Sequence, residues 1–79
     1  MSKAAIDVVS IVQYDLDSAL SEVHQVIHDI EQKQKKLKDK EEKEMVGEII
    51  SSLYQAIDSI ENAQMLGEDV DSYLEDKKE

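Results

Sequence analysis

The fold of this chain is decided by a polar segment in the middle of the sequence, residues 32–44, which reads QKQKKLKDKEEKE. Leu37 is its only apolar residue, and the segment separates two arms in which apolar residues recur every three or four positions. The periodicity loses its phase here, because positions 37 and 44 do not continue into the pattern that resumes at Val46. Asp39 also suits the start of a helix, since its side chain accepts hydrogen bonds from exposed backbone amides. The segment therefore predicts a turn at about residues 38–40.

Both arms are predicted to be long amphipathic helices, because the sequence has no Pro and only two Gly, at positions 47 and 67. In heptad notation the a and d positions are almost all apolar, and an adjoining e position widens the stripe to about three residues in seven, as expected of bundle helices. The a and d positions are Val9, Val12, Leu16, Ala19, Val23, Val26 and Ile30 in the first arm, and Val46, Ile49, Leu53, Ala56, Ile60, Ala63 and Val70 in the second. The e positions are Ile6, Leu20, Ile27, Ile50 and Ile57.

The sequence predicts one all-α domain over residues 1–79, an antiparallel hairpin with helix one at about 4–37 and helix two at about 41–66. Gly67 either ends helix two or lets helix one approach closely, and residues 68–79 form a short acidic third helix or a tail. This pairing sets Ile30 beside Ile49 and Val9 beside Val70. The alternative is a single continuous helix through residues 32–44, because Lys, Gln and Glu are good helix formers.

Self-association is expected because a chain of 79 residues buries a small core and has no Cys to staple it. A stripe three residues wide also leaves apolar atoms facing water after two helices pair. We predict a homo-oligomer, first of all a dimer that forms a four-helix bundle. Its predicted core consists of Val9, Val12, Leu16, Leu20, Val23, Ile27, Ile30, Val46, Ile50, Leu53, Ile57 and Ile60.

Some apolar residues near the start of the chain do not fit this core. At about 100° per residue, residues 4–14 are apolar on most of their circumference. We predict a contact site for another protein there, formed by Ile6, Val8, Ile11 and Tyr14. The alternative is that several subunits meet at this segment, or that the final short helix folds over it.

The charge is strongly acidic and unevenly distributed. The net charge is −10, and all nine basic residues are Lys, which argues against direct binding of nucleic acid because Arg is the usual reader of phosphate and guanine. Residues 32–44 carry six Lys against four acids, whereas residues 1–31 carry one Lys against six acids and residues 45–79 two against nine. The chain therefore has a basic middle between two acidic arms.

Several classes of function are disfavoured by the sequence. The longest apolar run is far shorter than a membrane span and no signal peptide is apparent, so we expect a soluble, cytoplasmic protein. His24 and His28 are four residues apart on the expected solvent side, but they lack convergent partners, and we predict neither a metal nor another cofactor. Without a Cys nucleophile, a Gly-rich phosphate loop or a deep pocket, we predict that the chain is not an enzyme.

The leading hypothesis is a small acidic protein–protein interaction module, acting as an adaptor, a chaperone-like partner or an inhibitor in oligomeric form. A second hypothesis is an acidic decoy that imitates a phosphate backbone and occupies a protein that binds nucleic acid. The carboxylates that would do so are Asp15, Glu22, Asp29, Glu48, Asp58 and Glu61. A third is an oligomer that sequesters a small anionic ligand between subunits, with contacts from the Lys-rich turn.

Overall fold

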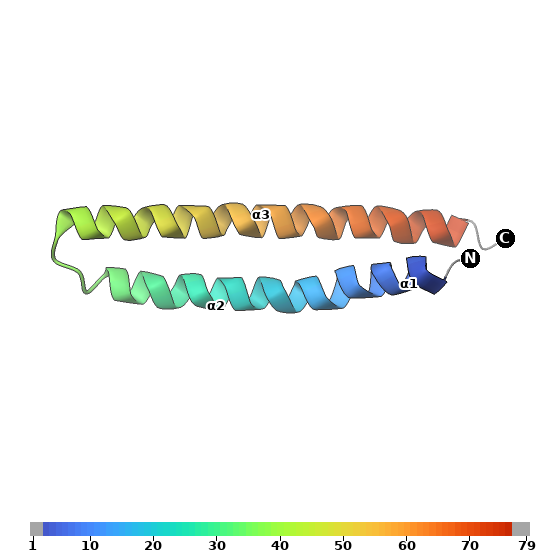
Figure 1. Ribbon diagram of the computed structural model, residues 1–79, viewed down its shortest axis with the longest axis horizontal. Helices are drawn as coiled ribbons and strands as arrows, with labels where there is room; N and C mark the ends of the chain where they lie inside the picture. Colours follow the sequence, from blue (N-terminus) through green and yellow to red (C-terminus); the bar gives the residue numbers. More distant parts are fainter. Residues whose placement is uncertain (1–2, 77–79) are drawn as a thin grey trace.

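The computed structural model describes residues 3–76, which form two long antiparallel helical arms joined by one turn (Figure 1). The first arm consists of α1 (Lys3–Ser10), the π-helix η1 (Ile11–Asp15) and α2 (Leu16–Gln34), and the second arm is α3 (Lys40–Asp76). The hairpin is thin and long, with extents of 62 × 15 × 13 Å. The predicted all-α fold and helical hairpin are confirmed, and the continuous-helix alternative is wrong.

The turn covers residues 35–39 and begins earlier than the predicted 38–40. The Leu37 amide donates to the Gln34 carbonyl at 3.1 Å, which tightens the chain after α2 ends. Asp39 starts α3, because its Oδ1 accepts from the Glu41 amide at 2.8 Å. Helix one stops at Gln34 rather than at residue 37. Leu37 follows in the turn and lines a hollow together with Val46.

The second arm is longer than predicted, because α3 continues through Gly67 to Asp76 without a break. Residues 68–76 are therefore part of α3 and not a separate helix or tail, and residues 77–79 lie outside the described residues. Gly67 is buried instead of ending the helix. A Cβ at this position would lie 3.2 Å from Val12 Cβ and nearer still to Val12 Cγ1. The second reading of Gly67, a close approach of helix one, is the one that the structure shows.

The core lies between the arms along their a and e positions. Ile27, Ile50 and Ile57, all at e, form its buried centre, and Leu20, Val23, Ile30, Val46 and Leu53 pack around them. The d positions lie at the flank of this core. The exposed fraction differs strongly between neighbouring residues, since Ile27 is 3% exposed and Val26 is 45% exposed. The predicted stripe is present, but the hairpin buries only one side of it.

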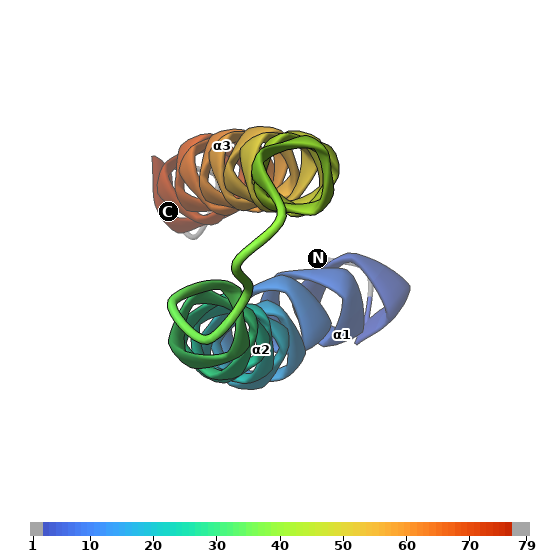
Figure 2. The ribbon, with the colours of Figure 1, turned by 90° about the vertical axis from the view of Figure 1, so that its left-hand side faces the viewer.

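The π-helix shifts the inward positions of the first arm by one residue. Before the π-helix, the positions that face α3 are a and d, occupied by Val9 at a and by Ala5 and Val12 at d. After the π-helix, e positions face α3 as well, occupied by Leu20 and Ile27. A π-turn closes i→i+5 hydrogen bonds and so takes up an extra residue, which turns the preceding helix by about 100° about its axis. Viewed from the turn, α1 leans to one side of α2 (Figure 2).

Candidate functional site

The hairpin leaves many of its large apolar side chains exposed to solvent. Only Val9, Ile27, Ile50 and Ile57 are buried hydrophobics among the described residues. The large hydrophobic residues that remain exposed are Ile6, Val8, Ile11, Tyr14, Val26, Met45, Ile49, Tyr54, Met65, Leu66, Val70 and Tyr73. Scattered exposed apolar residues are ordinary, so the arrangement of these residues decides whether they form a surface for binding.

All twelve residues of the predicted oligomer core are buried or half-buried within a single chain. They lie on the inner sides of the two arms, where Ile27, Ile50 and Ile57 form the buried cluster. Within the single chain, four of the twelve are buried and eight are only half-buried, so the hairpin supplies part of their predicted burial. A further surface for self-association is available among the residues that this core leaves outside.

One such surface runs along α3 and is formed by its d and g positions, which lie beside the core positions on one flank of the helix. We call it the α3 stripe: Met45, Ile49, Ser52, Ala56, Ser59, Ala63, Leu66, Val70 and Tyr73. None of its nine residues is charged, in a chain with 35% charged residues. The matching flank of α2 differs, because Glu22, Asp29 and Lys33 interrupt Ala19 and Val26.

The α3 stripe was only partly visible in the sequence pattern. Ile49 and Val70 were predicted as d positions of the apolar stripe, beside Ile30 and Val9, whereas they are 52% and 42% exposed. Met45, Leu66 and Tyr73 did not belong to the predicted stripe. The lack of charge at every g position of the second arm was the signal that marks them, since the first arm has Asp15, Glu22, Asp29 and Lys36 at g.

A shallow apolar hollow of about 290 Å³ lies between the first arm and the C-terminal half of α3, toward the end of the hairpin opposite the turn. We call it the open-end hollow, and its lining comes from both arms: Val8, Val9, Val12, Ala63, Leu66, Gly67 and Val70. Three of these residues, Ala63, Leu66 and Val70, belong to the α3 stripe. Because Gly67 has no side chain, the floor of the hollow is formed by Val12.

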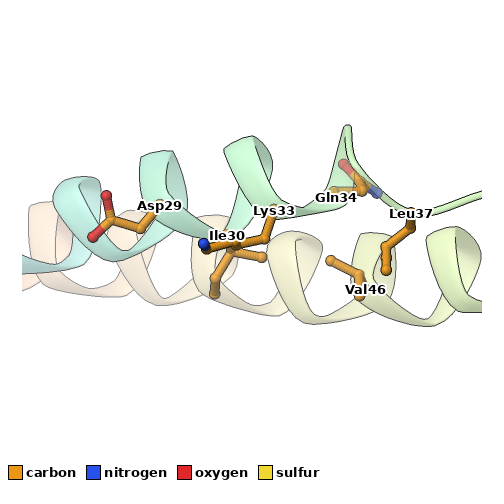
Figure 3. A pocket seen from close by; sticks show the side chains of 6 residues that line it. All are labelled: Asp29, Ile30, Lys33, Gln34, Leu37 and Val46. Atoms are coloured by element: carbon orange, nitrogen blue, oxygen red, sulfur yellow. The ribbon is translucent and has the colours of Figure 1, made fainter.

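A second hollow of about 300 Å³ lies next to the turn (Figure 3). It is lined by Asp29, Ile30, Lys33, Gln34, Leu37 and Val46. Figure 3 shows the Leu37 side chain beside Val46, with Lys33 and Asp29 on the neighbouring turns of α2. Gln34 Nε2 donates to the Lys43 carbonyl at 3.0 Å, which ties α2 to the start of α3 here. One amine and one carboxylate in the lining leave no surplus positive charge for an anionic ligand.

The four residues of the predicted partner contact are all exposed, with Tyr14 the most exposed at 69%. Ile6 and Val8 lie on α1, and Ile11 and Tyr14 on η1. Val8 turns toward the open-end hollow, whereas the other three are absent from its lining. The structure thus brings one of the four to a hollow and leaves the other three exposed elsewhere on the first arm.

His24 and His28 are exposed on α2. Within residues 3–76, no three His, Asp or Glu side chains are grouped so that they could hold a metal ion. No helix in the same range combines the length and the apolar character that crossing a bilayer requires. Comparisons of the chain with protein-family models, with curated proteins and with solved structures found no match.

Proposed function

We propose that this hairpin is a small, non-enzymatic protein–protein interaction module that works as a homo-oligomer, first of all as a dimer. The observation that carries the proposal is the ratio of buried to exposed apolar residues: four hydrophobic residues are buried and twelve large ones are exposed in the described chain. Exposed apolar surface on this scale is typical of surfaces that another protein covers. The cytoplasmic location expected from the sequence belongs to this proposal as well.

The proposal divides the exposed residues between two tasks. The α3 stripe is a long uncharged flank suited to self-association, whereas Ile11 and Tyr14 lie on η1 and are free to contact a different protein. A bundle of two hairpins presents this second surface twice, so the dimer acts as an adaptor, a chaperone-like partner or an inhibitor with two equivalent contact sites.

The test of self-association is light scattering coupled to size-exclusion chromatography, at low and at high salt. We expect a dimer whose mass does not change with salt, because apolar burial is insensitive to ionic screening. A chain that stays monomeric at all accessible concentrations would contradict the proposal.

The test of the partner surface compares the natural chain with the double variant Ile11→Lys/Tyr14→Lys. We expect the variant to remain a dimer and to lose a protein that co-purifies with the natural chain, with the loss reproduced by calorimetry on the purified pair. The control is Ser18→Lys/Ser21→Lys, which adds the same charge at two exposed positions of α2. Equal binding by the natural chain and the Ile11/Tyr14 variant would exclude this surface.

The acidic decoy is the second candidate, because all six carboxylates named for it are exposed on the outer sides of the hairpin. Salt separates the two candidates. Binding through these carboxylates falls steeply between low and moderate ionic strength, whereas apolar binding through η1 hardly changes.

A further inference from the structure

The α3 stripe is a long uncharged flank that runs along almost the whole of α3. Its bulky residues lie at the two ends, with Met45 and Ile49 at one and Leu66, Val70 and Tyr73 at the other. Its middle is small, with Ser52, Ala56, Ser59 and Ala63. About Ser59 the bulky ends correspond, Met45 with Tyr73 and Ile49 with Val70, whereas Leu66 corresponds to the smaller Ser52. Across a twofold axis near Ser59, each residue on one side of the axis meets its counterpart on the other.

The charges along the hairpin decide the direction in which a second copy fits. The turn end carries six Lys against four acids in residues 32–44, whereas the last part of the sequence, residues 61–79, carries seven acids against two Lys. A parallel copy would place lysines beside lysines and acids beside acids. An antiparallel copy places each Lys-rich turn beside the acidic open end of the other copy, which favours association at both ends.

The hairpin exposes more surface than a compact monomer of the same mass, because it is a thin rod. A folded monomer of 9.0 kDa exposes about 4,900 Å² by the usual scaling of area with mass, whereas the hairpin exposes 6209 Å². The excess of about 1,300 Å² exceeds the roughly 800 Å² that each partner buries in a typical stable complex.

We propose that the α3 stripe binds the α3 stripe of a second copy in antiparallel orientation, with the twofold axis near Ser59. This inference rests on the proposed function, because it specifies the surface and the direction of the homodimer. The α2 flank is excluded from the centre of the interface by Glu22 and Asp29, so α3 packs on α3. The arrangement places Ile49 of each copy opposite the open-end hollow of the other, next to Leu66 and Val70.

Single cysteines test this arrangement directly, because the natural chain has no Cys. Under mild oxidation we expect Ser59→Cys, at the axis, to form a covalent dimer with itself. Met45→Cys and Tyr73→Cys lie at opposite ends of the stripe. We expect neither variant to form a disulfide-linked dimer when it is oxidised alone, and a mixed disulfide-linked dimer to form when the two are combined. The matched control is Ser51→Cys, an exposed serine of α3 outside the stripe, which should form no dimer above the rate of random collision.

Each other outcome overturns the inference in a defined way. If Met45→Cys and Tyr73→Cys each cross-link to themselves, the copies are parallel. If Ser51→Cys cross-links as well as Ser59→Cys in a chain that light scattering shows to be dimeric, the stripe is not the interface, although the proposed function stands. A chain that is monomeric in light scattering overturns both.

A charge placed at the axis gives an independent readout without oxidation. Ser59→Lys brings two ammonium groups together across the interface, and we expect the dissociation constant from sedimentation equilibrium to rise on the order of tenfold or more. Ser51→Lys adds the same charge to the same helix and should leave that constant unchanged. Equal constants for the two variants would overturn the inference, and circular dichroism verifies that both remain helical.

Discussion

At the scale of single residues, Gly67 has the largest effect on how the two arms fit together. A glycine inside a helix is unfavourable by about 1 kcal/mol relative to alanine. Here it persists because Val12 occupies the space that a side chain would need. Val12 is β-branched and has few rotamers to move into, so it does not easily give way. Gly47 is different, because its nearest neighbour is the flexible end of Gln34, at 3.6 Å from an added Cβ.

The two glycines therefore predict opposite effects of the same substitution. Gly47→Ala should stabilise the hairpin by up to about 1 kcal/mol, since it gains helix propensity in ordinary contact. Gly67→Ala should destabilise it by about 1–3 kcal/mol, because the added methyl group overpacks the contact with Val12. Urea unfolding followed by circular dichroism measures both.

The same substitution in a chain that already carries a second change at Val12 separates the steric clash with Val12 from any other role of Gly67. In a chain that already carries Val12→Ala, the substitution Gly67→Ala should become neutral or stabilising, because the clashing methyl groups are gone. An equal loss of stability in both backgrounds would show that the contact with Val12 is not the cause.

The start of α3 depends on one hydrogen bond, from the Glu41 amide to Asp39 Oδ1 at 2.8 Å. Asp39→Ala removes this acceptor, and we expect a loss of about 1 kcal/mol in the free energy of unfolding. Asp58→Ala is the control, because it removes an exposed carboxylate from the middle of the same helix. Its effect should stay within about 0.5 kcal/mol in the same unfolding measurement. Equal losses would mean that net charge and not capping is responsible.

At the scale of elements, the apolar stripe of each helix is wider than the contact that the two arms make. The a and e positions meet in the core, and the d positions remain at its flank. Two isoleucines eight residues apart on α3 consequently have different surroundings: Ile57 is 5% exposed and Ile49 is 52% exposed. The same side chain therefore serves the core at one position and the α3 stripe at the other.

This difference predicts unequal costs of truncating two isoleucines. Ile57→Ala should destabilise the chain by about 2–5 kcal/mol at any concentration, because it leaves a cavity in the core. Ile49→Ala should change stability by less than about 1 kcal/mol under dilution to monomer, since much of its surface is already in solvent. Thermal unfolding at several chain concentrations measures both, and similar losses in the monomer would contradict the a and e assignment of the core.

At the scale of the whole molecule, the hairpin is 62 Å long and 15 Å wide, so association changes its length or its width. The antiparallel dimer proposed here overlaps the two copies side by side and hardly increases the longest dimension. End-to-end association would roughly double it, as expected for two rods joined at their tips.

Small-angle X-ray scattering on the dimer measures this directly. We expect a maximum dimension close to that of a single hairpin together with twice its mass. A maximum dimension near twice the hairpin length would contradict side-by-side packing. Because the interface is apolar along most of its length, the dimension should be the same at low and high salt.

The sequence by itself determined the features that depend on local chemistry. Periodic apolar residues, the absence of Pro and the capping by Asp39 were sufficient for two helices and a reversal between them. The pairing register of the two arms followed from the position of the turn. Val12 lies opposite Gly67, three residues further along each arm toward the turn than the predicted pair of Val9 and Val70, so both pairs belong to the same antiparallel register.

Only the tertiary structure decided which side of the stripe is buried. In the middle of each arm the a, d and e positions are similarly apolar, as at Val23, Val26 and Ile27, so periodicity cannot rank them. The choice depends on how closely two particular surfaces fit. The same reason applies to the length of α3, because Gly67 ends a helix in isolation but here permits close contact with Val12. The π-helix follows from this fit too, since one extra residue has to be taken up for the first arm to stay in register with α3.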